Sequence, residues 1–130
     1  MQVLFVEDNA INRRVVREML GAGGIEMSEA EDGLIGLQMI DANDYDLILM
    51  DLRMPGMDGI TAIRHLRARP DRKAGLPVIV ITADEGLTID SDCKLAGADD
   101  VLRKPVSMAV LFDTIGAVMA RRGGAPAMLA

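Results

Sequence analysis

The sequence has few of the residues that build disulfide scaffolds or zinc sites. Its 130 residues include one cysteine, Cys93, and one histidine, His65. One cysteine forms no internal disulfide, and these two side chains are too few for a zinc cluster. No apolar run approaches membrane-spanning length, and the start "MQVLFVEDN" is too short and too soon acidic for a signal peptide. We therefore expect a cytoplasmic protein without membrane insertion.

The chain also lacks an excess of positive charge. Its 14 Lys and Arg residues are scattered and outnumbered by 20 Asp and Glu residues, which gives a formal charge of -6. This balance argues against direct binding to nucleic acid. The length suits one domain, and the 50% share of hydrophobic residues is enough for a core. We expect a single globular domain over residues 1–122, followed by a flexible tail or linker over residues 123–130.

Short apolar runs alternate with helical patterns along the chain. Five runs predict strands: Val3 to Val6, Met27 to Ala30, Leu47 to Met50, Val78 to Ile81, and Val101 with Leu102. Stripes at spacings of three or four predict helices between and after them: Ile11, Val15 and Met19; Leu37 and Ile40; Ile60, Ile63 and Leu66; Leu111, Ile115 and Val118. A fourth, weaker helix is expected from Glu85 to Ala96. The alternation predicts a doubly wound α/β fold, with five parallel strands and five helices.

Polar residues stand where the predicted strands end. The first strand is followed by Glu7 and Asp8, the third by Asp51, the fourth by Thr82 and the fifth by Lys104. Ligands of parallel α/β sheets bind beyond these carboxyl ends. A single Asp in such a place is well explained as a helix cap. Five such residues together favour a site.

The charges at these strand ends predict a metal ion. If the first and third strands are neighbours, Asp8 faces Asp51, and two like charges about 4 Å apart repel by about 4 kcal/mol at an effective dielectric constant near 20. Lys104 alone does not balance three carboxylates. A second cation is implied, and oxygen ligands open to solvent suit Mg²⁺.

The same side chains could receive a phosphoryl group. An aspartate can act as the nucleophile, while a metal ion, an ammonium and a hydroxyl stabilise the charge on the transferring oxygens. Position alone does not decide which aspartate is the nucleophile.

Five motifs in combination resemble the receiver domain of two-component response regulators. The resemblance covers Gln2 to Arg121, nearly the whole chain. Within the family, the motifs are most similar to those of hybrid histidine kinase receivers and of single-domain response regulators. The resemblance implies the flavodoxin-like strand order 2-1-3-4-5, which is known for receiver proteins. The motifs are "VEDN" (Val6 to Asn9), "LILMDLRMPGMDG" (Leu47 to Gly59), "VIVITA" (Val78 to Ala83), "AGADD" (Ala96 to Asp100) and "KP" (Lys104 to Pro105).

The resemblance implies the roles of the acidic residues. Asp51 would be the phosphoacceptor and also a metal ligand. Asp8 would bind Mg²⁺ directly, Glu7 would bind it through water, and the backbone carbonyl of Arg53 would complete the protein ligands. Mn²⁺ could substitute for Mg²⁺.

The resemblance also implies the switch residues. Thr82 would bind a phosphoryl oxygen and shift on activation, and Lys104 would pair with the phosphoryl group. The Lys104–Pro105 peptide would be cis. The family usually has Tyr, Phe or His three residues before this lysine, whereas this chain has Val101. A valine has no polar edge, so the usual coupling between threonine and aromatic residue does not operate in that form.

Three functions remain open at this stage. The first is a signalling switch that is not a conventional enzyme and that a histidine kinase or histidine phosphotransfer protein phosphorylates, with an unknown output partner and oligomeric state. In this reading Arg53 and Asp84 could pair across the site and lengthen the phosphoryl lifetime. The second is a pseudo-receiver, a scaffold independent of phosphorylation. The third is an aspartyl-phosphate phosphohydrolase, disfavoured because Arg53 occupies the place of the second aspartate of haloacid dehalogenase-type enzymes.

Overall fold

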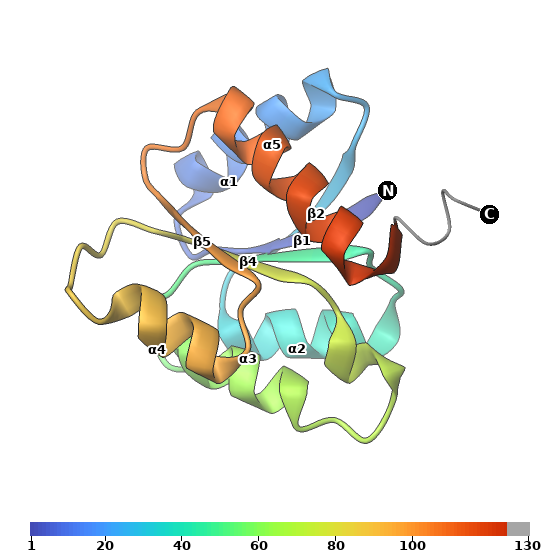
Figure 1. Cartoon of the computed structure of the whole chain (residues 1–130), viewed down its shortest axis with the longest axis vertical. Helices are drawn as coiled ribbons and strands as arrows, with labels where there is room; N and C mark the ends of the chain where they lie inside the picture. Colours follow the sequence, from blue (N-terminus) through green and yellow to red (C-terminus); the bar gives the residue numbers. More distant parts are fainter. Residues whose placement is uncertain (125–130) are drawn as a thin grey trace.

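The computed structural model describes residues 1–124 and contains one parallel sheet in the order β2-β1-β3-β4-β5 (Figure 1). This is the order implied by the resemblance, and the predicted fold class is confirmed. All strand pairings are parallel, with Val6 of β1 opposite both Ala30 of β2 and Met50 of β3. The strands are β1 (Gln2–Val6), β2 (Glu26–Ala30), β3 (Leu47–Met50), β4 (Val78–Thr82) and β5 (Asp100–Arg103).

Helices cover both faces of the sheet. In Figure 1, α1 and α5 lie on one side of the strands, and α2, α3 and α4 lie on the other. A short 3₁₀ turn, η1 (Arg72–Gly75), leads into β4, and a π-helical turn, η2 (Ala120–Gly124), follows α5. The helices are α1 (Ala10–Ala22), α2 (Gly33–Ala42), α3 (Gly59–Arg67), α4 (Ile89–Ala96) and α5 (Met108–Met119).

The uninterrupted apolar runs form strands because both faces of the sheet are buried. Side chains alternate between two cores. Val3 and Phe5 of β1 pack with α1 and α5, whereas Leu4 and Val6 pack on the side of α2, α3 and α4. All four side chains are fully buried. The carboxyl end of β1 is therefore held firmly from both sides.

The helix predicted from Ile11, Val15 and Met19 is confirmed as α1, but only Met19 of this stripe packs against the core. Ile11 and Val15 are exposed by 73% and 43%, whereas Val16 and Leu20 are buried. Val15 and Val16 start two stripes about 100° apart on the helix, and spacing alone does not choose between them. Contact with the sheet decides for the second stripe.

The fourth helix begins later than predicted. It runs from Ile89 instead of Glu85, and the residues before it are irregular apart from a turn at its start. Thr88 precedes the helix without capping it, since its hydroxyl hydrogen-bonds to the Asp92 carboxylate instead. Gly86 in the preceding segment also disfavours an earlier start.

The Lys104–Pro105 peptide is cis, as the resemblance implied. Of the expected tail, Gly123 and Gly124 end η2, and residues 125–130 lie outside the described part of the chain. Within residues 1–124, no helix combines the length and apolar character needed to cross a bilayer.

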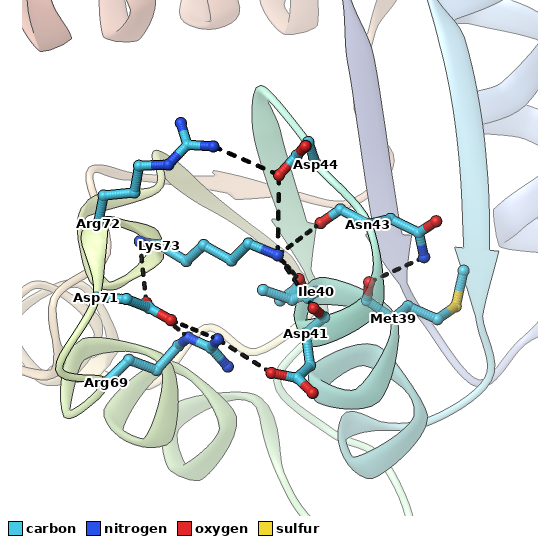
Figure 2. A network of polar contacts seen from close by, with 9 residues as sticks. All are labelled: Met39, Ile40, Asp41, Asn43, Asp44, Arg69, Asp71, Arg72 and Lys73. Atoms are coloured by element: carbon cyan, nitrogen blue, oxygen red, sulfur yellow. Dashed lines mark hydrogen bonds and ion pairs between the residues drawn. The ribbon is translucent and has the colours of Figure 1, made fainter.

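Lys73 of η1 hydrogen-bonds to the end of α2, near the amino ends of β3 and β4 and away from the polar carboxyl ends of the strands. Figure 2 shows its ammonium among backbone oxygens: it donates to the carbonyls of Ile40 at 2.7 Å and of Asp41 and Asn43 at 3.1 Å. These carbonyls belong to the last turn of α2 and the residue after it, where the helix presents unpaired acceptors and negative partial charge. Lys73 therefore acts as a C-terminal cap supplied from another element.

We expect Lys73→Met to destabilise the fold. The Lys73 side chain is only 19% exposed, so its loss leaves carbonyls without their donor and costs about 1 to 3 kcal/mol in the free energy of unfolding. The neighbouring Arg72 is 86% exposed and lies 3.6 Å from Asp44, so Arg72→Met should change that free energy by less than about 0.5 kcal/mol. Urea unfolding measures both variants, and equal effects would contradict the capping role.

Candidate functional site

The structure brings the five predicted strand-end residues together. They line one open pocket of about 450 Å³ at the carboxyl ends of β1, β3, β4 and β5. The parallel order explains this, because β1 and β3 are neighbours and their carboxyl ends lie at the same edge. The lining residues are Glu7, Asp8, Asn9, Asn12, Asp51, Arg53, Thr82, Ala83, Asp84 and Lys104.

Three carboxylates converge in this pocket. Glu7, Asp8 and Asp51 each offer an oxygen atom within 4.8 Å of the other two. Glu7 and Asp51 are buried, and Asp8 is exposed. The helix caps are other residues, such as Asn9 for α1 and Asp58 for α3. The capping explanation therefore fails for Asp8 and Asp51.

Lys104 is the ammonium that faces these acids. Its Nζ lies 2.6 Å from Glu7 Oε1 and 3.4 Å from Asp51 Oδ1. Burial lowers the pKa of Lys104, but its hydrogen bond to Glu7 and the charge of Asp51 outweigh burial and raise that pKa overall. Partial burial and the adjacent Glu7 carboxylate raise the pKa of Asp8. One ammonium thus faces three carboxylates.

This donor set fits a hard divalent cation. The three acids supply only oxygen atoms, the pocket is open to water, and two negative charges remain after pairing with Lys104. Mg²⁺ prefers oxygen ligands and keeps several of its own waters. Glu7, Asp8 and Asp51 are the residues that could hold it. A bound Mg²⁺ would neutralise charge on the oxygens of a transferring phosphoryl group.

Thr82 lines the pocket, whereas Val101 lies outside it. Thr82 is fully buried and lines the pocket, and its hydroxyl accepts a hydrogen bond from the Asp84 amide at 3.0 Å. Val101 is half-buried on β5 opposite Val80, and it packs against the core beside α4. Val101 is not among the residues that line the pocket.

Arg53 and Asp84 form an ion pair at the rim. The guanidinium donates from Nε to Asp84 Oδ2 at 2.9 Å and also contacts this oxygen through Nη2. The backbone hydrogen bond from Gly86 and the Arg53 side chain lower the pKa of Asp84. The pair joins the segment after β3 to the segment after β4, and both residues line the pocket.

Asn12 and Gly59 support the site but were not predicted. The Asn12 amide donates to Glu7 Oε1 at 3.2 Å, and its place in the first turn of the helix after the acid pair could have indicated this. Gly59 packs directly beneath Asp51: a Cβ at this glycine would lie 2.2 Å from the Asp51 carbonyl oxygen. Sequence gives no comparable signal for this contact.

Comparison with known proteins agrees with the geometry. Residues 3–116 match the family described as "Response regulator receiver domain". The chain is similar to the two-component response regulator ORR41 of Oryza sativa subsp. japonica, at 40% identity over 93% of each chain. It is also similar to the sensor histidine kinase RcsC of Salmonella typhimurium, at 36% identity over 94% of this chain. It spans only 12% of the length of that kinase.

A solved structure shows the same fold with a metal ion. The receiver domain of the sensor histidine kinase PA1611 from Pseudomonas aeruginosa PAO1 superposes with a TM-score of 0.83 and 33% identity, over 92% of this chain and 97% of that domain. That structure has a magnesium ion coordinated in its active site cleft. From the family match, these similarities and the shared fold we conclude that the chain belongs to the response regulator receiver domain family of two-component phosphorelay signalling.

Proposed function

We propose that the chain is a Mg²⁺-dependent switch that accepts a phosphoryl group on Asp51. One observation carries the proposal. The buried Asp51 carboxylate lines an open pocket, 3.4 Å from the Lys104 ammonium and beside the two other acids. A buried acid in contact with a cation and open to a ligand from one side is suited to nucleophilic attack.

The proposed reaction is a simple displacement. A carboxylate oxygen of Asp51 attacks the phosphorus atom of a phosphohistidine, the oxygen–phosphorus bond forms, and the nitrogen–phosphorus bond breaks with release of the imidazole. Asp8, Asp51 and the backbone carbonyl of Arg53 would hold Mg²⁺, with Glu7 acting through water. Mn²⁺, which also accepts oxygen ligands, would substitute.

Lys104 and Thr82 would bind the transferred group. Lys104 needs only to exchange part of its contact with Glu7 for a phosphoryl oxygen, since it already lies near Asp51. The Thr82 hydroxyl lies in the same pocket and would bind a second oxygen. Beyond this, the chain would catalyse only its own phosphorylation and dephosphorylation.

The phosphodonor would be a histidine kinase or a histidine phosphotransfer protein. Exposed apolar residues beside the pocket support a protein donor. Ile11 and Val15 project from α1, the helix that follows the acid pair, and Val15 borders an apolar cleft that also contacts Lys104 and Val106. The output partner would bind the surface around α4 and β5, with Val101 in place of the usual aromatic residue.

Labelling with a small phosphodonor tests this function. Intact-protein mass spectrometry after incubation with acetyl phosphate should show one added phosphoryl group, only in the presence of Mg²⁺. Folded protein without labelling would favour the phosphorylation-independent scaffold. Sustained hydrolysis of a phosphate ester would favour the phosphohydrolase.

The Arg53–Asp84 pair is expected to lengthen the phosphoryl lifetime. Because both residues line the pocket that holds Asp51, their pair would restrict the water that attacks the phosphorylated Asp51. We expect Arg53→Ala and Asp84→Ala each to raise the dephosphorylation rate about two- to fivefold, in keeping with the modest strength of exposed ion pairs. Decay of the labelled protein after removal of the donor measures this rate, and unchanged rates in both variants would refute the role.

A further inference from the structure

An arginine, Arg13, hydrogen-bonds to the loop that contains the acid pair Glu7 and Asp8, which we call the acid-pair loop. Arg13 Nη1 donates to the backbone carbonyl of Glu7 at 2.7 Å. This carbonyl belongs to the peptide group that joins Glu7 to Asp8, the two acids after β1. Arg13 is absent from the lining of the pocket, so it touches the loop without facing the reacting atoms.

Arg13 is itself held by an acid on a neighbouring strand. Its Nε donates to Glu29 Oε1 at 2.8 Å, and Glu29 lies on β2 opposite Phe5. The Arg13 side chain is only 13% exposed. Burial raises the pKa of Glu29, but hydrogen bonds from Arg17 and Arg13 outweigh it and keep that pKa below its ordinary value of 4.5. The carboxylate therefore stays charged at neutral pH.

Arg17 provides an internal comparison. It also pairs with Glu29, through Nε at 2.9 Å and through Nη2, but it reaches no atom of the acid-pair loop. Both arginines thus make an ion pair between α1 and β2, and only Arg13 extends it to the Glu7 carbonyl. If the two arginines served only to pair α1 with β2, loss of either one would have a similar effect on Mg²⁺ binding.

We propose that Arg13, held by Glu29, is a positioning residue that fixes the Glu7–Asp8 peptide so that both carboxylates point toward the Mg²⁺ site. The proposal rests on the proposed function of that site. The physical reason is that Asp8 is exposed and follows directly on the peptide group that Arg13 holds, so the direction of its carboxylate depends on the backbone beneath it. Groups that hold metal ligands in place without touching the metal strongly affect metal affinity.

Titration of the unphosphorylated protein with Mg²⁺ tests the proposal. Isothermal titration calorimetry at pH 7 gives the dissociation constant for wild type, Arg13→Met, Arg17→Met and Arg13→Lys. We expect Arg13→Met to weaken Mg²⁺ binding about tenfold, and Arg17→Met to change it less than about twofold. Arg13→Lys should fall between them, because one ammonium does not reproduce the two separate donors. Urea unfolding without metal checks that both Met variants are folded under the conditions of the titration.

The outcomes separate this inference from the function on which it rests. Equal weakening of Mg²⁺ binding in Arg13→Met and Arg17→Met, or none in Arg13→Met, would overturn the positioning role alone. A wild type that binds no Mg²⁺ would overturn the proposed function and this inference with it. If Arg13→Met does not fold, Glu29→Gln replaces it. Weaker Mg²⁺ binding than in Arg17→Met supports the role, and an unchanged dissociation constant refutes it.

Discussion

Gly59→Ala should disable the site and destabilise the protein. The added Cβ would lie 2.2 Å from the Asp51 carbonyl oxygen and 2.9 Å from the Leu52 Cα. Both are backbone atoms at the end of the buried strand β3, so no side chain can rotate away to make room. We expect a loss of about 2 to 4 kcal/mol in the free energy of unfolding. Any folded fraction should label poorly with acetyl phosphate, because Asp51 is displaced.

Gly116→Ala is the matched control for this prediction. Gly116 also lies in a helix, α5, but it is exposed and a Cβ there meets nothing within 4 Å. Replacing a helical glycine without steric conflict should stabilise the fold by about 0.5 to 1 kcal/mol. Urea unfolding and labelling with acetyl phosphate, measured on both variants, test the predicted loss of stability and of phosphorylation. A Gly59→Ala protein that is as stable and as readily labelled as wild type would show that the contact beneath Asp51 is unimportant.

Asp8→Asn should reduce phosphorylation while stabilising the protein. The change removes the charge of a proposed metal ligand, so Mg²⁺-dependent labelling should slow on the order of a hundredfold. In metal-free buffer it also removes a negative charge beside the buried carboxylates of Glu7 and Asp51. The melting temperature should therefore rise. Slower labelling together with a higher melting temperature is expected only if the acids lie close together to bind a ligand and not to stabilise the fold.

The stabilisation should depend on pH in a defined direction. Because the pKa of Asp8 is raised in the folded protein, ionisation of Asp8 costs folding free energy. This cost is present at pH 7 and shrinks as the pH falls through the raised pKa. It disappears below the ordinary value of 3.8, where Asp8 is protonated in both states. Metal-free melting curves at pH 7 and near pH 3.5 should show the gain from Asp8→Asn shrinking toward zero, and a gain independent of pH would contradict this explanation.

The three central strands could be predicted because they are short and apolar on both faces. Runs such as "LILM" and "VIVI" have no alternation to misread, and all four residues of Leu47–Met50 are buried as expected. The helix face was less predictable. On α1 two apolar stripes lie side by side, and only packing against β1 and β3 distinguishes the buried Val16 from the exposed Val15. Helix spacing contains no information about that contact.

The residues of the site could be predicted where polar side chains directly follow the apolar strands. Parallel strands bring their carboxyl ends to one edge, so Asp8, Asp51 and Lys104 could be placed together once the strand order implied by the resemblance was assumed. The supporting contacts could not. The hydrogen bond from Arg13 to the Glu7 carbonyl involves a backbone atom, which the sequence does not distinguish from any other. Such contacts depend on side-chain conformations that only the folded structure specifies.

The position of the phosphoryl group is the most direct test of the central claim. The protein is labelled with acetyl phosphate and Mg²⁺, then treated with borohydride, which reduces an aspartyl phosphate to homoserine, and its peptides are sequenced by mass spectrometry. We predict homoserine at position 51 in the wild type, none without Mg²⁺, and none anywhere in Asp51→Asn. Homoserine at another aspartate, or labelling that persists in Asp51→Asn, would contradict it.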